Sequence, residues 1–438
     1  MIPESLKPFP AEGGGLAANL RESTNAFVAA ATSIELAHPD GLATPGTKTL
    51  TDQVKDELDG EGVVWSPGLA QRIADLAQNT QLSEEVAAAA VADAIDRAQG
   101  SRFDELLAGT GTWTLEAGDP YPVAAAPLDW HDDRMSHPVA QPRTPGDLRN
   151  LRFAPPLVGT FEVRFHCHDA DVLVLPPFGS VVATGHPDLA LAECGEPGEV
   201  APDGFFGFPN RDPSHDGWVR DVVAAAAGAH VVVLPELSVD DGLAAELVAT
   251  WRGEHIGSRA HVFVPGSRHI EVDGRRANRT EVHVSGLDAP LVADKQAPFA
   301  TGGRTEALDA IATGVDIHVV GRWRIAACIC LDALRTDVPQ LLAQLGVTLL
   351  IIPAMSPDAT GFEPLSALVK ANAGVFVVAN NPAEWPKDDH HPVRRPAQMV
   401  IGLPLGHPAG PTVNVGAGGN AVRGVWRIGL DDGLPSHT

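Results

Sequence analysis

Short apolar runs alternate with amphipathic segments along the second half of the chain. The segment WVRDVVAAAAGA (218–229) leads directly into the apolar run HVVVLPE (230–236), and a helical pattern at 240–252 precedes the run HVFVPG (261–266). Apolar positions that recur every three or four residues are typical of a helix, whereas a short continuous apolar run is typical of a buried strand. This order of helix and strand predicts a layered α/β architecture.

The same order recurs further along the chain. The apolar runs RIAACICLD (324–332) and TLLIIPA (348–354) enclose the helical pattern TDVPQLLAQLG (336–346), and the segment PLSALVKANAG (364–374) precedes the strand VFVVANN (375–381). Strands this apolar are typical of a sheet that is covered on both faces. In such sheets, functional residues usually follow the ends of strands.

The first part of the chain is predicted to be mostly helical. Alanine-rich segments lie near 22–33 and 68–78, and the clearest helix starts at the N-cap residue Ser83 and continues as EEVAAAAVADAIDRA towards Gly100. These segments contain no recognisable catalytic constellation. We therefore interpret this part as a helical packing module or as a surface for a protein partner.

A stretch rich in proline and glycine follows the helical part. Residues 111–160 disfavour regular helix and predict an ordered connector or irregular edge strands. Several short apolar runs between 161 and 195 have the pattern of strands, and one of them is expected to begin the next domain. The predicted organisation is a helical accessory region with its connector at 1–150 and an α/β domain at 151–438.

Composition and charge argue against several classes of protein. Of the 438 residues, 44% are hydrophobic and 20% are charged, which is typical of a globular chain. The formal charge of -25 opposes a nucleic-acid backbone or an anionic membrane surface, because both require a cationic footprint. Apolar runs such as 344–355 are well short of the roughly 20 residues of a membrane helix. We therefore expect neither nucleic acid nor a membrane as a partner.

The cysteines indicate a reducing environment. Cys167, Cys194, Cys328 and Cys330 show no spacing that suggests a disulfide framework, and the chain does not begin with a basic and then apolar signal. The expected location is the cytoplasm.

Three residues with chemical potential lie at, or just after, the ends of apolar runs. Glu236 follows AHVVVLP, Lys295 follows SGLDAPLVAD, and Cys330 ends RWRIAACIC. Taken singly, they would be a solvated glutamate, a surface lysine and a packed cysteine. Together they supply what cysteine attack on an amide or nitrile requires: a thiolate, a proton carrier and a cation that faces the developing negative charge.

These segments resemble the nitrilase superfamily, whose members place a Glu, a Lys and a Cys in this order on a four-layer αββα domain. The matching segments are VVVLPEL (231–237), LVADKQAP (291–298) and ACICLD (327–332). The resemblance covers roughly residues 185–425 and none of the N-terminal region. It implies a carbon-nitrogen hydrolase that works through a cysteine thioester.

The resemblance also implies a role for each residue. Cys330 is the expected nucleophile, Glu236 the general base and Lys295 the oxyanion stabiliser. The segment RRANRTEVHV resembles the family's strand before the lysine hairpin and supplies Asn278. The segment TEALDAIATGVDIHVVG supplies Glu306 in the place of the family's second glutamate, which would hold the lysine or orient the substrate and the attacking water.

Two cysteines compete for the role of nucleophile. Cys328 and Cys330 lie two residues apart and would share one face of a continuous strand. Only Cys330, which lies at the strand's end before a helix, can open into a pocket, so we interpret Cys328 as a packed thiol. The backbone N–H of Leu331 is the candidate oxyanion donor. Family members that cleave nitriles usually have Trp then Glu after the cysteine, so Leu331 and Asp332 favour amide or carbamoyl cleavage.

The implied chemistry also limits cofactors and partners. The steps need neither a metal nor an organic cofactor, and the expected partner is a small-molecule substrate of the amide type. Nitrilase-like domains commonly assemble through helices that flank the site, so a homo-oligomer is expected.

Several alternatives remain at this stage. The chain could be a nitrilase-like binding or regulatory module without activity, or a Cys-His protease that uses one of its 17 histidines. The run FHCHD places His166, Cys167, His168 and Asp169 together, but alternation along a strand would divide these possible zinc ligands between two faces. The segment 385–396 is either a lid over the pocket or a solvated loop.

Overall fold

The computed structural model describes most of residues 204–380 and shorter segments on either side. The shorter segments are 45–61, 111–115, 120–122, 151–153, 156–168, 180–185, 398–402, 412–415, 424–429 and 435–437, with isolated positions between 72 and 94. The helix expected near 22–33, most of the helix expected at 364–374, and the loop 385–396 lie outside the described residues.

The chain forms two compact units. The first contains residues 1–109, 114–125 and 131–160, and the second contains residues 110–113, 126–130 and 161–438. In the first unit, helix α2 (Pro45–Glu61) buries Leu50 and Val54, which lie four residues apart on one face. Thr51 on the same helix donates a hydrogen bond to the carbonyl of Ala90 (3.1 Å).

One sheet of the second unit has eight strands among the described residues, in the order β1-β4-β14-β15-β16-β17-β18-β19. Strand β14 pairs in parallel with β4 and antiparallel with β15, whereas β15, β16 and β17 run parallel to one another. The strands are β1 (Gly111–Leu115), β4 (Glu162–Cys167), β14 (Gly314–Val320), β15 (Trp323–Ala327), β16 (Leu349–Ala354), β17 (Val375–Asn380), β18 (Gln398–Gly402) and β19 (Thr412–Val415).

A second sheet has the order β11-β10-β8-β7-β5-β20-β21, with β9 paired to β10. Its central strands β5, β7 and β8 are parallel. The strands are β5 (Ser180–Gly185), β7 (Val231–Val233), β8 (Val262–Val264), β9 (Ser267–Val272), β10 (Arg275–Val284), β11 (Leu291–Asp294), β20 (Gly424–Gly429) and β21 (Pro435–His437).

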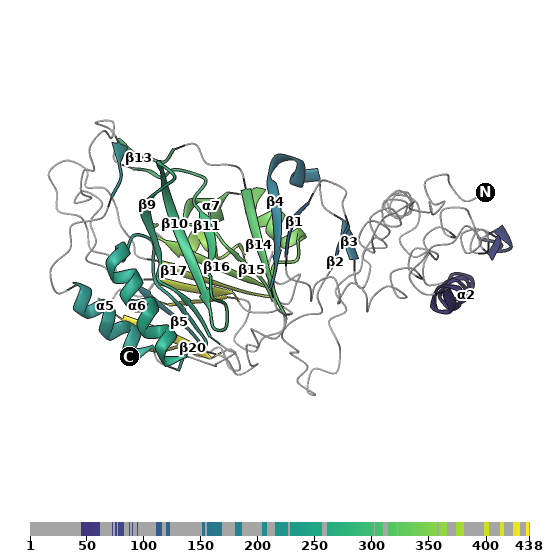
Figure 1. Ribbon diagram of the computed structural model, residues 1–438, viewed down its shortest axis with the longest axis horizontal. Helices are drawn as coiled ribbons and strands as arrows, with labels where there is room; N and C mark the ends of the chain where they lie inside the picture. The colour runs from purple at the N-terminus through teal and green to yellow at the C-terminus, as the bar shows by residue number, and fades with distance from the viewer. Residues whose placement is uncertain are drawn as a thin grey trace. The chain divides into compact units, whose positions relative to one another are not determined.

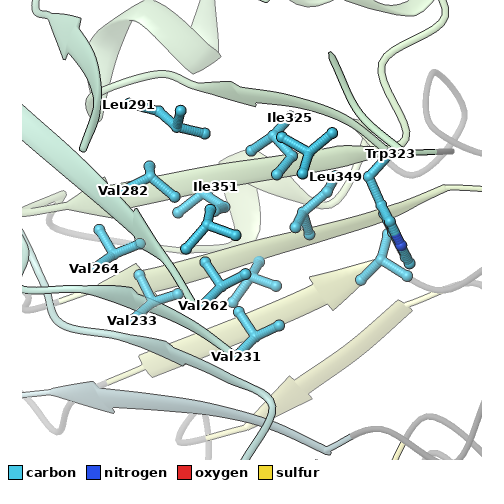
Figure 2. Packing of buried hydrophobic residues seen from close by; sticks show 14 of the residues in the cluster. Val231, Val233, Val262, Val264, Val282, Leu291, Trp323, Ile325, Leu349 and Ile351 are labelled. Carbon is cyan, nitrogen blue, oxygen red and sulfur yellow. The ribbon is translucent and has the colours of Figure 1, made fainter. Parts of the chain in front are cut away.

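The two sheets pack face to face over one hydrophobic core (Figures 1 and 2). Alternate residues of β7 and β8 point into this core, as the two-residue period of a strand requires. Opposite them lie side chains of β15, β16 and β17. The labelled core residues in Figure 2 are Val231, Val233, Val262, Val264, Val282, Leu291, Trp323, Ile325, Leu349 and Ile351.

Two helices cover the other face of the second sheet (Figure 1). Helix α5 (His215–Ala225) and helix α6 (Asp241–Glu254) pack their apolar stripes on Val232 and Phe263, the outward neighbours of the core valines. The side chain of Asp240 caps α6 by accepting a hydrogen bond from the Leu243 N–H (2.8 Å). The α/β prediction is therefore confirmed, with one helical layer and two stacked sheets among the described residues.

The remaining elements are short. They are strands β2 (Pro120–Pro122), β3 (Leu151–Phe153), β6 (Gly204–Phe205), β12 (Ala300–Thr301) and β13 (Arg304–Glu306), helices α7 (Leu331–Leu334) and α8 (Asp337–Gln344), and 3-10 helices η3 (Pro156–Thr160) and η5 (Thr360–Phe362). Within the described part of the chain, no helix is both long and apolar enough to span a membrane.

Gly266 is a point where the backbone tolerates no side chain. Its φ of +81° lies in the left-handed region, and a Cβ built there would lie 2.1 Å from the carbonyl oxygen of Pro235. We expect Gly266→Ala to lower the free energy of unfolding by about 3 kcal/mol, because backbone strain and steric overlap add. Urea denaturation would measure this loss.

Gly274 provides the matched control. Its φ of +73° is similar, but a Cβ built there would meet nothing within 4 Å. Gly274→Ala should therefore show only the conformational penalty, about 1 kcal/mol. Equal losses in the two variants would contradict the steric role of Gly266.

Candidate active site

Glu236 lies just beyond the end of β7, where the strand leaves the sheet. It forms an isolated parallel bridge with Ser267, and the next residue, Leu237, has a φ of 52° and donates its N–H to the Ser267 carbonyl (2.8 Å). The Ser238 hydroxyl donates to the carbonyl of Pro235 (2.7 Å). This tight turn holds the carboxylate of Glu236 in a buried position.

Lys295 follows the last residue of β11, and its backbone N–H donates to the carbonyl of Asn278 on β10 (2.8 Å). Its side chain is only 1% exposed. The ammonium Nζ lies 2.7 Å from Oε1 of Glu236 and 2.6 Å from Oε2 of Glu306. Three charged groups from β7, β11 and β13 therefore meet in the protein interior.

Asn278 joins the two carboxylates. Its Nδ2 donates to Oε1 of Glu236 (2.9 Å) and to Oε1 of Glu306 (2.8 Å), and the Phe299 N–H donates to Oε2 of Glu306 (2.9 Å). Buried carboxylates persist in the charged form only when they are paired and hydrogen-bonded. Asn278 and the Lys295 ammonium supply this pairing.

The pKa values of the paired groups move in the directions that keep both charged. Burial by itself raises the pKa of Glu306, but the Lys295 ammonium and the hydrogen bond from His269 outweigh it and hold that pKa well below its ordinary value. Burial by itself lowers the pKa of Lys295, but the charges of Glu236 and Glu306 raise it overall. The site therefore contains a permanent cation at neutral pH.

Cys330 lies where the extended chain after β15 turns into α7. It has a φ of 45°, uncommon for a residue with a side chain, and its N–H donates to the carbonyl of Pro353 (3.0 Å). The residue is 2% exposed, and its thiol lies within the electrostatic influence of the Glu236 carboxylate and the Lys295 ammonium.

The Cys330 thiol is protonated in the resting protein. Burial and then the negative charge of Glu236 raise its pKa well above the ordinary value, and the nearby Lys295 ammonium lowers it only in part. A thiol of this kind needs a base that accepts its proton as it attacks. Glu236 is the carboxylate whose charge acts on this thiol.

Asp332 ties the turn after Lys295 to the turn after Cys330. Its carboxylate accepts hydrogen bonds from the backbone N–H groups of Gln296 (2.8 Å) and Ala297 (2.7 Å). Burial raises the pKa of Asp332 to about 6, although these two hydrogen bonds oppose the rise. The acid that stands two residues after the cysteine thus positions the lysine loop.

The structure brings together Glu236, Lys295, Glu306 and Asn278, and the Cys330 thiol lies close enough to feel the charges of Glu236 and Lys295. Cys328 is buried, its N–H donates to the carbonyl of Ile351 (3.0 Å), and burial raises the pKa of its thiol.

Sequence reasoning missed His269 on β9, whose Nε2 lies 2.8 Å from Oε1 of Glu306. A signal for it was present. Asp273 and Gly274 both have positive φ in the two-residue turn between β9 and β10, and Asp-Gly in such a hairpin fixes the register that places His269 opposite Asn278.

Of the residues considered as zinc ligands, His166, Cys167 and His168 lie elsewhere in the fold, on and just after β4, and Asp169 lies outside the described residues. His166 contacts Asp316 through Nε2 (2.6 Å), and His168 contacts Nδ1 of His318 (3.1 Å). His166 and His168 both stack on the His318 ring, with centroids 4.6 and 5.4 Å apart. Among the residues that the structure describes, no group of three His, Cys, Asp or Glu side chains could hold a metal ion.

Comparisons with known proteins give structural matches alone. No protein-family model matches the sequence, and no curated protein matches it. Among solved structures, the chain is similar to an amidase from Nesterenkonia sp., with 17% identity and a TM-score of 0.41 over 58% of this chain and 91% of that one.

Two other matching structures are variants of the Nesterenkonia sp. AN1 amidase. An active-site variant described as belonging to the nitrilase superfamily has 18% identity and a TM-score of 0.40, covering 58% of this chain and 91% of that one. A double mutant in complex with acrylamide has 16% identity and a TM-score of 0.42, covering 59% and 92%. These structural neighbours are nitrilase-superfamily amidases.

Proposed function

We propose that this chain is a carbon-nitrogen hydrolase of the nitrilase superfamily that cleaves a small amide or carbamoyl compound. The observation that carries the proposal is the meeting of Glu236, Lys295 and Glu306 through contacts of 2.6 and 2.7 Å, beside the buried Cys330 thiol, whose pKa responds to the charges of Glu236 and Lys295. Buried charges are costly, and such a cluster at strand ends marks a functional site.

In the first half-reaction, Glu236 accepts the thiol proton while the sulfur of Cys330 attacks the carbonyl carbon. Oε1 of Glu236 already accepts from Lys295 and Asn278, which leaves Oε2 for this proton. The carbonyl π pair moves onto oxygen, and the Lys295 ammonium and the Leu331 N–H stabilise that oxyanion. The first N–H groups of a helix have no partner within it, which makes the Leu331 amide available at the start of α7.

The oxyanion then collapses and the carbon-nitrogen bond breaks, which completes the first half-reaction. Glu236 returns its proton to the departing nitrogen, so ammonia or an amine leaves and a thioester remains on Cys330. Water then attacks the thioester, with Glu236 accepting its proton. The carbon-sulfur bond breaks, Cys330 regains a proton, and the carboxylic acid leaves. These steps involve no metal or organic cofactor.

Glu306 and Asn278 support this chemistry without taking the thiol proton. Glu306 and Glu236 both hold the ammonium of Lys295, and Asn278 donates hydrogen bonds to both carboxylates. In this proposal they keep Lys295 pointed at the reacting oxygen. Such pre-organised charges cost no reorganisation when the transition state forms.

The proposed family membership extends to the fold and the assembly. The inner face of the first sheet is filled by the second sheet, so the β15 to β16 crossover through α8 would run over the outer face and form the fourth layer. A small-molecule substrate and assembly into a homo-oligomer complete the proposal.

Ammonia release from a panel of small amides, carbamoyl compounds and nitriles would test the proposed function. We expect turnover of at least one amide or carbamoyl compound and a single covalent adduct on Cys330 after treatment with fluoroacetamide, located by peptide mass spectrometry. Adduct formation without turnover of any panel member would favour a binding or regulatory module. The absence of both turnover and adduct would refute the proposed site.

A further inference from the structure

His269 is a buried histidine in direct contact with the charged cluster. Its side chain is 0% exposed, and Nε2 lies 2.8 Å from Oε1 of Glu306. The ring of Phe206 stacks on it, with centroids 4.8 Å apart and an angle of 15° between the planes. Because Glu306 carries a negative charge and can only accept, Nε2 carries a proton and donates it to this hydrogen bond.

The other ring nitrogen of His269 faces both polar groups of one residue. Nδ1 lies 3.0 Å from the backbone N of Gly207 and 2.9 Å from its carbonyl oxygen. Gly207 has a φ of +108°, a backbone conformation that favours glycine. A neutral ring accepts the Gly207 N–H at Nδ1, and a cationic ring donates Nδ1–H to the Gly207 carbonyl. Both protonation states are therefore hydrogen-bonded.

The charged groups near His269 do not balance while its ring is neutral. Glu236 and Glu306 carry two negative charges against the single positive charge of Lys295, so the cluster has a net charge of -1 while His269 is neutral. Asn278, which is paired with His269 on the adjacent strand, is uncharged. Phe205, Phe206 and Gly207, which contact the His269 ring, are uncharged as well. Next to it in sequence, Arg268 is paired with Asp241 and Glu281.

We propose that His269 is a positioning residue that sets the charge of the site: its cationic form neutralises Glu306 and directs the positive field of Lys295 towards Glu236 and Cys330. This inference rests on the proposed function. A proton from solvent adds to Nδ1, and the ring changes its Gly207 partner from N–H to carbonyl.

The test compares the rate at which iodoacetamide alkylates Cys330 in the wild type, in His269→Gln and in His283→Gln. Glutamine can still donate to Glu306 but cannot become cationic. His283 is a matched control because it is buried and lies 3.5 Å from Glu281, outside the cluster. Peptide mass spectrometry at a series of pH values measures the rate at Cys330 alone.

We expect His269→Gln to slow alkylation roughly tenfold on the acidic side of the series. Losing a nearby cation raises the thiol pKa, and a rise of about one unit reduces the thiolate fraction tenfold. The ratio of the two rates should change with pH, because only the wild-type ring can take up a proton. His283→Gln should follow the wild type throughout. A His269→Gln to wild-type ratio that does not change with pH would overturn the proposal.

A second measurement covers the case in which His269→Gln fails to fold. Magnetic resonance of isotope-labelled histidine in the wild-type protein reports the charge of each ring, and a His269 ring that stays neutral across the series would overturn the proposal. Ammonia release, measured on the same proteins, tests the proposed hydrolase function independently of the proposed role of His269. The wild type could turn over no amide while the ratio of His269→Gln to wild-type alkylation rates still changes with pH. This result would refute the proposed function and retain the role of His269.

Discussion

Replacing Cys330 by alanine is expected to abolish amide hydrolysis, with a fall in kcat of roughly four orders of magnitude or more, because no thioester can form without the nucleophile. The substitution removes one buried sulfur atom and leaves the backbone free to keep its turn. The free energy of unfolding should therefore change by about 1 kcal/mol or less. Ammonia release and urea denaturation measure the two quantities.

Cys328→Ala is the matched control for this loss. Cys328 is also buried, lies two residues away and has a thiol whose pKa burial raises, but it is not among the groups that contact Glu236 or Lys295 in the described site. This variant should retain most of the activity. Equal retention of activity in both variants would refute the assignment of Cys330 as the nucleophile.

The places of Glu236, Lys295 and Cys330 in the fold could be predicted because each residue follows the end of an apolar run or a hairpin. Glu236 and Cys330 each follow a run of buried apolar residues, just beyond the ends of β7 and β15, which belong to the two sheets that pack face to face. Lys295 follows a hairpin whose register is fixed over four residue pairs. Local pattern therefore drew attention to these three residues, and the resemblance to the nitrilase superfamily suggested their roles.

The local backbone at Cys330 could not be predicted in the same way. The apolar pattern over 324–332 suggests one continuous strand, but β15 ends at Ala327. The N–H groups of Cys328 and Cys330 still donate to carbonyls of the neighbouring strand β16, at Ile351 and Pro353. A φ of 45° at Cys330 then turns the chain, and a positive φ at a residue other than glycine has no signature in hydrophobic periodicity.

Side-chain pairing across elements was the other part that sequence could not supply. Asp332 was recognised as an acid after the cysteine, but its hydrogen bonds to the backbone of Gln296 and Ala297 depend on two turns that are distant in sequence. His269 is similar, because its partner Glu306 belongs to a different sheet. Such contacts follow from tertiary packing, which no local spacing encodes.

Lys295→Met is expected to affect both activity and stability. Methionine keeps the apolar stem but removes the proposed oxyanion stabiliser, so kcat should fall by roughly three orders of magnitude. It also leaves the carboxylates of Glu236 and Glu306 buried without a cation, and removing one partner of a buried ion pair costs about 3–5 kcal/mol. Ammonia release and urea denaturation would measure the two losses.

The stability loss of Lys295→Met should depend on pH in a defined direction. In the wild type, the folded-state pKa of Glu306 is lowered, so its ionised form stabilises the fold above the unfolded pKa and this contribution disappears as the pH falls. Without Lys295, the effect of burial dominates and protonation relieves the unpaired charge. The difference from wild type should therefore be larger at about pH 8 than at about pH 5.

The double variant Lys295→Met with Glu306→Gln separates the two effects of the lysine. Glutamine cannot carry the unpaired charge, so the double variant should recover part of the stability lost at neutral pH while remaining without activity. A single Lys295→Met variant that is as stable as the wild type at neutral pH would contradict the buried charge cluster. Recovery of activity in the double variant would instead show that Lys295 serves only to neutralise Glu306, because an oxyanion stabiliser cannot be replaced by removing a neighbouring carboxylate.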